Sequence, residues 1–158
     1  MRKIGIIAVL SLLALALAAV PALAASGSPH FIKSATNASI DQNSNLVVNF
    51  KEAGLSNGSV ETITLSGTGT ATYQCFNNGG NHPKAGNKET VSSSESSTGQ
   101  FTVQNGNVTG SLSLAPPGPG SFSCPPGQTL EGPTNVSYSN VTLSDTTSGQ
   151  SVSFGTVK

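Results

Sequence analysis

The feature that most constrains this chain is an alternation of apolar and other side chains with a period of two residues. In the run 46–50, Leu46, Val48 and Phe50 share one parity, and Phe101 and Val103 do the same further on. A strand points successive side chains to opposite faces, so each run predicts a half-buried strand, and no helical periodicity longer than two turns follows Ala24. The runs counted as strands are 31–40, 46–51, 62–65, 71–75, 89–94, 101–104, 108–114, 136–138, 141–143 and 152–154.

Turn-forming residues separate the runs at the short, regular intervals that are typical of a sandwich. Asn57-Gly58, Asn105-Gly106 and Ser148-Gly149 lie between them, and Asn-Gly favours a hairpin because both residues tolerate positive φ. The apolar phase slips before Val141, which predicts a bulge or a change of sheet near Asn140. The pattern is typical of an all-β chain, an immunoglobulin-like antiparallel β-sandwich of about 7–9 strands. We expect it to form a single domain over residues 25–158.

Composition supports a folded, two-sided sheet protein and excludes several other classes. Ser, Thr, Asn and Gly fill about half of the positions after Ala24, while charged residues are 9 % of the chain and Trp is absent. A helical bundle needs more Ala, Glu, Lys and Leu, and a nucleic-acid binder needs a basic excess. A disordered chain combines few apolar residues with high net charge, whereas the whole chain has a net charge of zero.

The segment from Met1 to Ala24 has the pattern of a signal peptide. Arg2 and Lys3 precede an apolar run over 4–20, and Ala22 and Ala24 form an A-x-A cleavage site. We expect cleavage after Ala24, an extracellular protein and no membrane span in the mature chain; an uncleaved anchor is the alternative. The leader looks bacterial, which would leave the five N-x-[ST] sequons unmodified, whereas a eukaryotic host would glycosylate them. The sequons begin at Asn37, Asn57, Asn107, Asn135 and Asn140.

Two cysteines, Cys75 and Cys124, are present in the mature chain. An exported protein matures in an oxidising compartment, so a disulfide between them is the default prediction. Closing a loop of about 50 residues removes roughly 4 kcal/mol of unfolded-state entropy. Metal ligation is the alternative, but the spacing matches no zinc motif.

Two segments rich in Gly, Pro or Asn interrupt the strand pattern, 76–88 and 115–127. Neither favours regular structure, and the disulfide would join them as two loops. Loops on a rigid scaffold often carry binding sites, so they form the candidate recognition surface; the alternative is that they only connect strands. The candidate residues are Phe76, Asn81, His82, Pro116, Pro117, Phe122 and Pro125.

The chain offers few residues for catalysis. His30 and His82 are the two histidines, and no G-x-S-x-G elbow accompanies the many serines. Nothing in the sequence places two acids across a cleft, as glycoside chemistry requires. We therefore expect a protein that is not an enzyme and has no cofactor and no metal. The acids considered as partners of a histidine are Asp41, Glu52, Glu61, Glu89 and Asp145.

Several strand and turn segments resemble known secreted sandwich proteins. Segments 54–60, 101–114, 141–145 and the run ending at Cys75 are similar, in the same order, to those of the neocarzinostatin-like chromoprotein group and of small secreted actinobacterial immunoglobulin-like proteins. The resemblance implies a sandwich fold and, for the chromoprotein group, an enediyne-type chromophore held between the sheets. That group's two short-range disulfides have no counterpart here, so the fold is carried over and the ligand is not.

These observations favour a secreted, non-enzymatic binding or surface-associated module. Its partner would be an extracellular protein, a glycan or a small molecule, with no nucleic acid, and we expect a monomer. Two alternatives stay open: a carrier of a chromophore-type small molecule, and an inhibitor of secreted proteases that presents the Pro-rich loop around Cys124 as a rigid substrate mimic.

Overall fold

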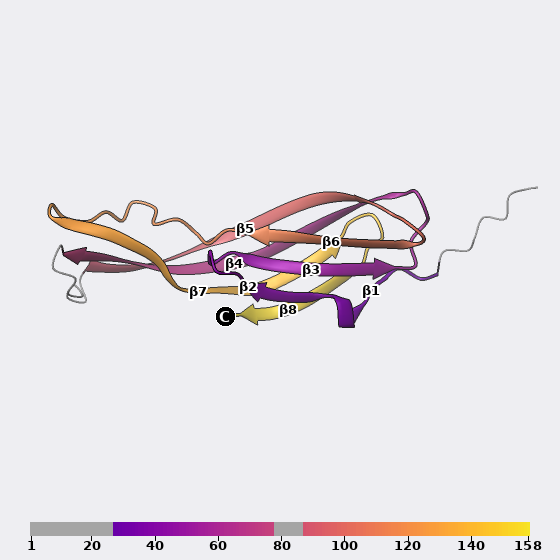
Figure 1. Cartoon of the computed structure of the whole chain (residues 1–158), viewed down its shortest axis with the longest axis horizontal. Helices are drawn as coiled ribbons and strands as arrows, with labels where there is room; N and C mark the ends of the chain where they lie inside the picture. Colours follow the sequence, from indigo (N-terminus) through magenta and orange to yellow (C-terminus); the bar gives the residue numbers. More distant parts are fainter. Residues whose placement is uncertain (1–26, 78–86) are drawn as a thin grey trace, which may run out of the picture.

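The computed structural model describes residues 27–77 and 87–158. The expected leader, and Asn81 and His82 of the candidate loop, lie outside these ranges. The chain forms an elongated all-β molecule of two antiparallel sheets, which confirms the predicted sandwich (Figure 1). Its elements are β1 (His30–Phe31), the short 3-10 helix η1 (Lys33–Ala35), β2 (Asn37–Ile40), β3 (Leu46–Ala53), β4 (Val60–Asn77), β5 (Lys88–Thr102), β6 (Asn107–Leu114), β7 (Gln128–Asp145) and β8 (Ser151–Val157).

The smaller sheet is built around β3. On one side β3 pairs with β2, and its last residues Glu52 and Ala53 pair with the short β1. On the other side it pairs along its whole length with β6. Residues Leu46, Val48 and Phe50 of β3 point into the molecule and are at most 1 % exposed, as their shared parity predicts.

The larger sheet has the order β5-β4-β7-β8 and contains much longer strands than the sequence pattern indicates. The runs at 62–65 and 71–75 are parts of one 18-residue strand, β4. The apolar signal is interrupted between them because Gly67 and Gly69 occupy the inward positions. A Cβ at Gly69 would lie 2.9 Å from Pro117 Cδ, and one at Gly67 would lie 3.4 Å from the Ser139 carbonyl oxygen. The runs at 89–94 and 101–104 likewise share β5, which ends at Thr102.

The core lies between the two sheets where they overlap. Phe50 packs edge-to-face against both Phe31 and Phe101, with ring centroids 6.3 and 5.1 Å apart. The Tyr138 ring is fully buried, and its hydroxyl donates to the carbonyl oxygens of Ser44 and Leu114. The remaining buried apolar residues of this cluster are Leu46, Val48, Leu55, Ile63, Leu65, Val103, Val108, Leu114, Val141 and Leu143.

Strand β7 contains the predicted bulge. Asn140 has a φ of 53°, and the pairing registers of β7 with both β4 and β8 shift at this point. A second irregularity lies at Asn135, with a φ of 50°, where the β4 register shifts again. Asn tolerates this left-handed conformation better than most residues, so both bulges fall where the sequence permits them.

The predicted hairpin turn at Asn105-Gly106 is confirmed. Both residues have positive φ, 50° and 75°, as a type I′ turn requires. Gln104 and Asn107 exchange two backbone hydrogen bonds, of 2.9 and 3.0 Å, and the turn leads directly into β6.

Strands β4, β5 and β7 continue beyond the sandwich as a three-stranded arm (Figure 1). We define the arm as residues 70–77, 88–92 and 128–137. The disulfide between Cys75 and Cys124 is formed, with the two Cα atoms 5.5 Å apart. It joins the segment 115–127 to a strand and not to a second loop, because Phe76 and Asn77 extend β4 by pairing with Thr129 and Gln128. The loop expected over 76–88 is therefore shorter than predicted, and Lys88 already belongs to β5.

Candidate functional site

The predicted loop over 115–127 is present, but part of it is devoted to covering the arm. Pro117 is buried, and its carbonyl oxygen accepts a hydrogen bond of 2.7 Å from the buried Tyr73 hydroxyl. Pro116 and Phe122 are half-buried, and Pro125 is exposed. Cys124 fixes the segment a second time through the disulfide. The segment thus covers the face of the arm that carries Tyr73, and the buried Pro117 is not available to a partner.

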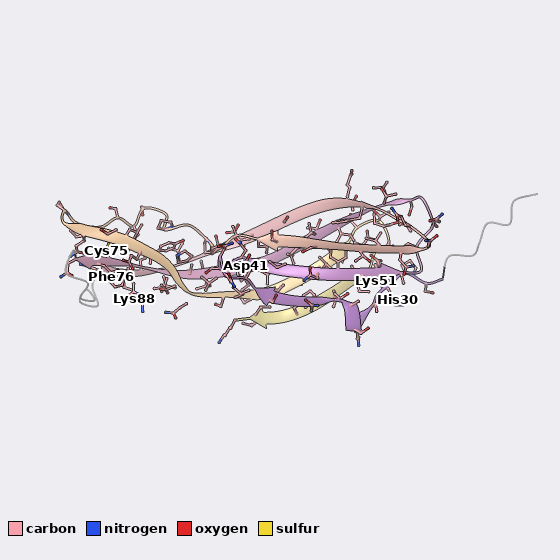
Figure 2. All side chains as sticks on the ribbon, viewed as in Figure 1. His30, Asp41, Lys51, Cys75, Phe76 and Lys88 are labelled. Atoms are coloured by element: carbon pink, nitrogen blue, oxygen red, sulfur yellow. A yellow bond between two sulfur atoms is a disulfide. The ribbon has the colours of Figure 1, made fainter. Side chains whose placement is uncertain are left out.

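The other loop candidates are dispersed. Phe76 is a half-buried residue of β4, and Figure 2 shows it beside Cys75 and near Lys88 at the far end of the arm. His30 lies at the opposite end of the molecule, exposed, with its Nδ1 2.9 Å from the Ser28 carbonyl oxygen. The described candidates therefore do not converge on one site around a histidine.

A more extensive feature is the outer face of the larger sheet. The register pairs Thr64 of β4 with Thr98 of β5 and Ser144 of β7, and the next four outward positions of β4 are paired in the same way. All fifteen positions of these five rows are Ser or Thr, and we call them the hydroxyl face. From β5, β4 and β7 in turn they are Thr98, Thr64, Ser144; Ser96, Ser66, Thr142; Ser94, Thr68, Ser139; Ser92, Thr70, Ser137; and Thr90, Thr72, Thr134.

The bulges of β7 keep its Ser and Thr residues on this face. Ser144 and Thr142 have even numbers, Ser139 and Ser137 have odd numbers, and Thr134 is even again. A strict alternation would place these groups on opposite faces, because a shift of one residue exchanges the two faces of a strand. Each bulge adds one residue to β7 relative to β4 and restores the outward phase.

Hydrogen bonds between side chains order the hydroxyl face. The hydroxyls of Thr64 and Thr98 lie 2.9 Å apart, and those of Thr70 and Ser92 lie 2.8 Å apart. The Thr134 hydroxyl donates to the backbone carbonyl of Thr72 at 3.1 Å. Neighbouring strands and alternate residues set the spacing of the array at about 4.8 Å across the strands and about 6.6 Å along them.

The five rows themselves contain no charged or aromatic side chain, and the charged residues next to them are Glu95, between Ser94 and Ser96, and those of the row beyond Thr72. The next row after Thr72 consists of Lys88, Gln74 and Glu131. Near the bulge, a hollow of about 350 Å³ is lined by Gly67, Asn140, Glu95 and four residues of the hydroxyl face: Ser66, Thr68, Ser94 and Ser96. The surface thus offers neutral donors and acceptors, together with one depression that Glu95 also lines.

Sequence reasoning missed this surface because two of its three strands, β5 and β7, do not show it clearly. The run 89–94 reads as a weak polar segment, and the Ser and Thr residues of β7 change parity twice. The signal that was available is the uninterrupted spacing of Thr62, Thr64, Ser66, Thr68, Thr70 and Thr72 at every second position of β4.

A second unexpected cluster lies at the end of the sandwich away from the arm. Glu52, Glu61 and Asp145 are 0, 3 and 1 % exposed. Glu52 faces Asp145 across the two sheets, in the interior of the sandwich and not across a cleft. Burial, followed by the nearby Asp145, raises the Glu52 pKa to about 7, although a hydrogen bond from Ser148 opposes the shift. Each acid occupies an inward position of its strand, two residues from Phe50, Ile63 or Leu143. This spacing is the feature of the sequence that could have predicted their burial.

In the part of the chain that the structure describes, no group of three or more His, Cys, Asp or Glu side chains is arranged to hold a metal ion. The same ranges contain no helix with the length and hydropathy that a membrane crossing requires.

Comparison with known proteins gives no relative from which a role could be transferred. No protein-family model, curated protein or solved structure matches the chain.

Proposed function

We propose that this protein is a secreted, non-enzymatic binding module that attaches to a neutral polysaccharide through the hydroxyl face. The observation that carries the proposal is the array of five rows of three Ser or Thr residues with no charged residue among them. The proposed export rests on the leader pattern at residues 1–24.

The chemistry of the face selects the class of partner. A nucleic acid or an acidic polymer needs cationic side chains, and an apolar partner needs exposed apolar area; the fifteen positions supply neither. Apart from that of Thr72, which is buried, each hydroxyl can donate one hydrogen bond and accept others, so it can pair with sugar hydroxyls, which have the same capacity. The rigid sheet holds these groups in place before binding, which lowers the entropy lost on association.

The hydroxyl face is favoured over a site between the sheets or on the loop. Phe50, Leu65 and Tyr138 fill the space between the sheets, where the chromoprotein group holds its ligand. The segment 115–127, which an inhibitor would present to a protease, is tied to the arm through Pro117 and Cys124. We therefore favour a glycan partner over a carried chromophore or an inhibited protease.

The test compares two double variants in co-sedimentation with insoluble cellulose, chitin and β-glucan. Thr70→Val with Ser92→Ala removes a hydrogen-bonded pair from the hydroxyl face, while Thr109→Val with Ser111→Ala removes the same groups from exposed positions of β6 on the other sheet. We expect the first variant to bind at least one of these polymers about tenfold more weakly than the unmodified protein, since two hydrogen bonds are worth roughly 1 to 2 kcal/mol.

The β6 variant should bind like the unmodified protein, and added salt should leave binding unchanged because no charged pair is involved. Equal binding by both variants would exclude the hydroxyl face as the contact surface. Failure of the unmodified protein to sediment with any of the three polymers would overturn the proposed partner class.

A further inference from the structure

Two carboxyl groups meet inside the sandwich, and no basic side chain in the described part of the chain pairs with them. Glu52 lies near the end of β3 in the smaller sheet, and Asp145 is the last residue of β7 in the larger sheet. Their side chains are 0 and 1 % exposed. Glu61 of β4, 3 % exposed, lies in the same region and accepts a hydrogen bond from the Ser59 hydroxyl.

Each of the two groups has one satisfied oxygen and one orphaned oxygen. The backbone N–H groups of Thr147 and Ser148 donate to Asp145 Oδ1 at 2.8 and 3.3 Å. The Ser148 hydroxyl donates to Glu52 Oε1 at 2.7 Å. Glu52 Oε2 and Asp145 Oδ2 are buried, and neither has a hydrogen-bond partner among the residues that the structure describes. A buried acceptor without a donor is costly, and a buried charge without a partner is more so.

Within residues 27–77 and 87–158, the elements around the pair supply no positive charge to it. On β1, Phe31 pairs opposite Glu52, while His30 pairs opposite Ala53 and is exposed. On β6 the residue opposite Glu52 is Val108. Lys51 has the opposite parity to Glu52 on β3 and lines a surface hollow together with Thr109. The turn 146–150 contains no titratable side chain, so the groups that face Glu52 are Asp145 and Glu61.

We infer that Glu52 and Asp145 share a single proton, and that the resulting hydrogen bond links the two sheets at this end of the sandwich. The proton resides on Glu52 Oε2 and is donated to Asp145 Oδ2, which gives both orphaned oxygens a partner. Asp145 is taken as the acceptor because its other oxygen, Oδ1, already accepts hydrogen bonds from two backbone N–H groups. The raised pKa of Glu52, about 7, agrees with this assignment.

A proton satisfies the site better than a metal ion does. Calcium takes six to eight oxygen ligands and magnesium keeps several waters, whereas the orphaned side-chain oxygens here are two and both are closed off from solvent. A hydrogen bond between an acid and a carboxylate requires only two oxygens.

Loss of the proton should loosen the turn between β7 and β8. Ser148 donates to both acids, and Thr147 accepts from the backbone N–H of Thr62 on β4, so the turn depends on the state of the pair. With Glu61 and Leu55, the same two turn residues line a pocket of about 230 Å³. Deprotonation places two adjacent negative charges beneath this pocket.

The test follows the melting temperature of the unmodified protein and of Glu52→Gln as pH rises from 4.5 to above 7. We expect the unmodified protein to lose about 10 °C over this range, because the folded state alone holds the proton. Glu52→Gln keeps a donor toward Asp145 and should show much less dependence on pH. The exposed Glu131→Gln is the control and should behave like the unmodified protein.

Carbon-13 NMR of the carboxyl groups tests the inference without a variant. Glu52 should be protonated at pH 5.5 and titrate near 7. Titration of Glu52 at its ordinary value of 4.5 would overturn the inference. So would a rise in melting temperature on adding millimolar calcium at pH 8 in the unmodified protein but not in Glu52→Gln, since the pair would then hold a metal ion.

Discussion

At the scale of single residues, a glycine of β6 packs tightly against two aromatic rings of the core. A Cβ on Gly110 of β6 would lie 2.5 Å from Phe101 Cε1 and 2.8 Å from Phe50 Cζ. Phe101 belongs to the larger sheet and Phe50 to the smaller one, so this contact helps to hold the sheets together. The alternation places Gly110 on the same face as Val108, but only the structure explains why that position has no side chain.

We expect Gly110→Ala to destabilise the protein by about 1 to 3 kcal/mol, because the added methyl group forces both rings to move. Equilibrium unfolding in urea measures the change. Gly118→Ala is the matched control, since a Cβ there meets nothing within 4 Å and should leave stability nearly unchanged. Equal midpoints for the two variants would show that the rings around Gly110 yield without cost.

At the scale of elements, the sequence predicts which residues form strands but not how long the strands are. The short runs and the bulge at Asn140 were predicted because apolar alternation and its phase are local. The continuity of β4 was missed because Gly67 and Gly69 hide the alternation, and their reason, close approach by β7 and Pro117, is a long-range contact. The hydroxyl face was missed on the same grounds, since it exists only after three strands are in register.

The bulge at Asn140 should tolerate glycine and resist a β-branched residue. Asn140→Val places a branched side chain at a φ of 53°, which costs about 1 to 2 kcal/mol, while Asn140→Gly should be close to neutral. Urea unfolding of both variants measures the difference. Equal free energies of unfolding for Asn140→Val and Asn140→Gly would show that the left-handed conformation at this position does not disfavour a β-branched residue.

Reduction of the disulfide should act on the arm more than on the sandwich. The cysteines are 49 residues apart, so the chain-entropy estimate for their link is about 4 kcal/mol. Hydrogen exchange before and after reduction should show faster exchange at Tyr73 and Cys75, while Ile63 and Leu65 keep their protection. Uniform loss of protection along β4 would mean that arm and sandwich unfold as one unit.

At the scale of the whole molecule, the shifted pKa values of Glu52 and Asp41 limit stability at opposite ends of the pH range. The Glu52 pKa is raised, so the folded state binds a proton that the unfolded state lacks between pH 4.5 and about 7, and stability falls as pH rises through this window. The Asp41 pKa is lowered by a side-chain hydrogen bond from Asn45 and by the Asn45 and Asn43 backbone N–H groups, so its contribution is lost as pH falls below 3.8.

The stability maximum is therefore expected at about pH 4 to 5. Urea unfolding at a series of pH values should show a decrease of about 3 kcal/mol between this maximum and pH 8, as a shift of the Glu52 pKa from 4.5 to about 7 implies. A maximum at pH 7 or above would contradict this profile.

The bulge of β7 at Asn140 has a further consequence for how this sequence tolerates change. The residues of β7 directly before Asn140, at positions 136–139, keep their faces because of the one extra residue at that bulge. Deleting Asn140 would shift the residues before it by one position relative to β4. Tyr138 would then point to solvent, and Ser137 and Ser139 would point into the core. The loss of this single residue would thus exchange the buried and exposed faces of the part of β7 that precedes it.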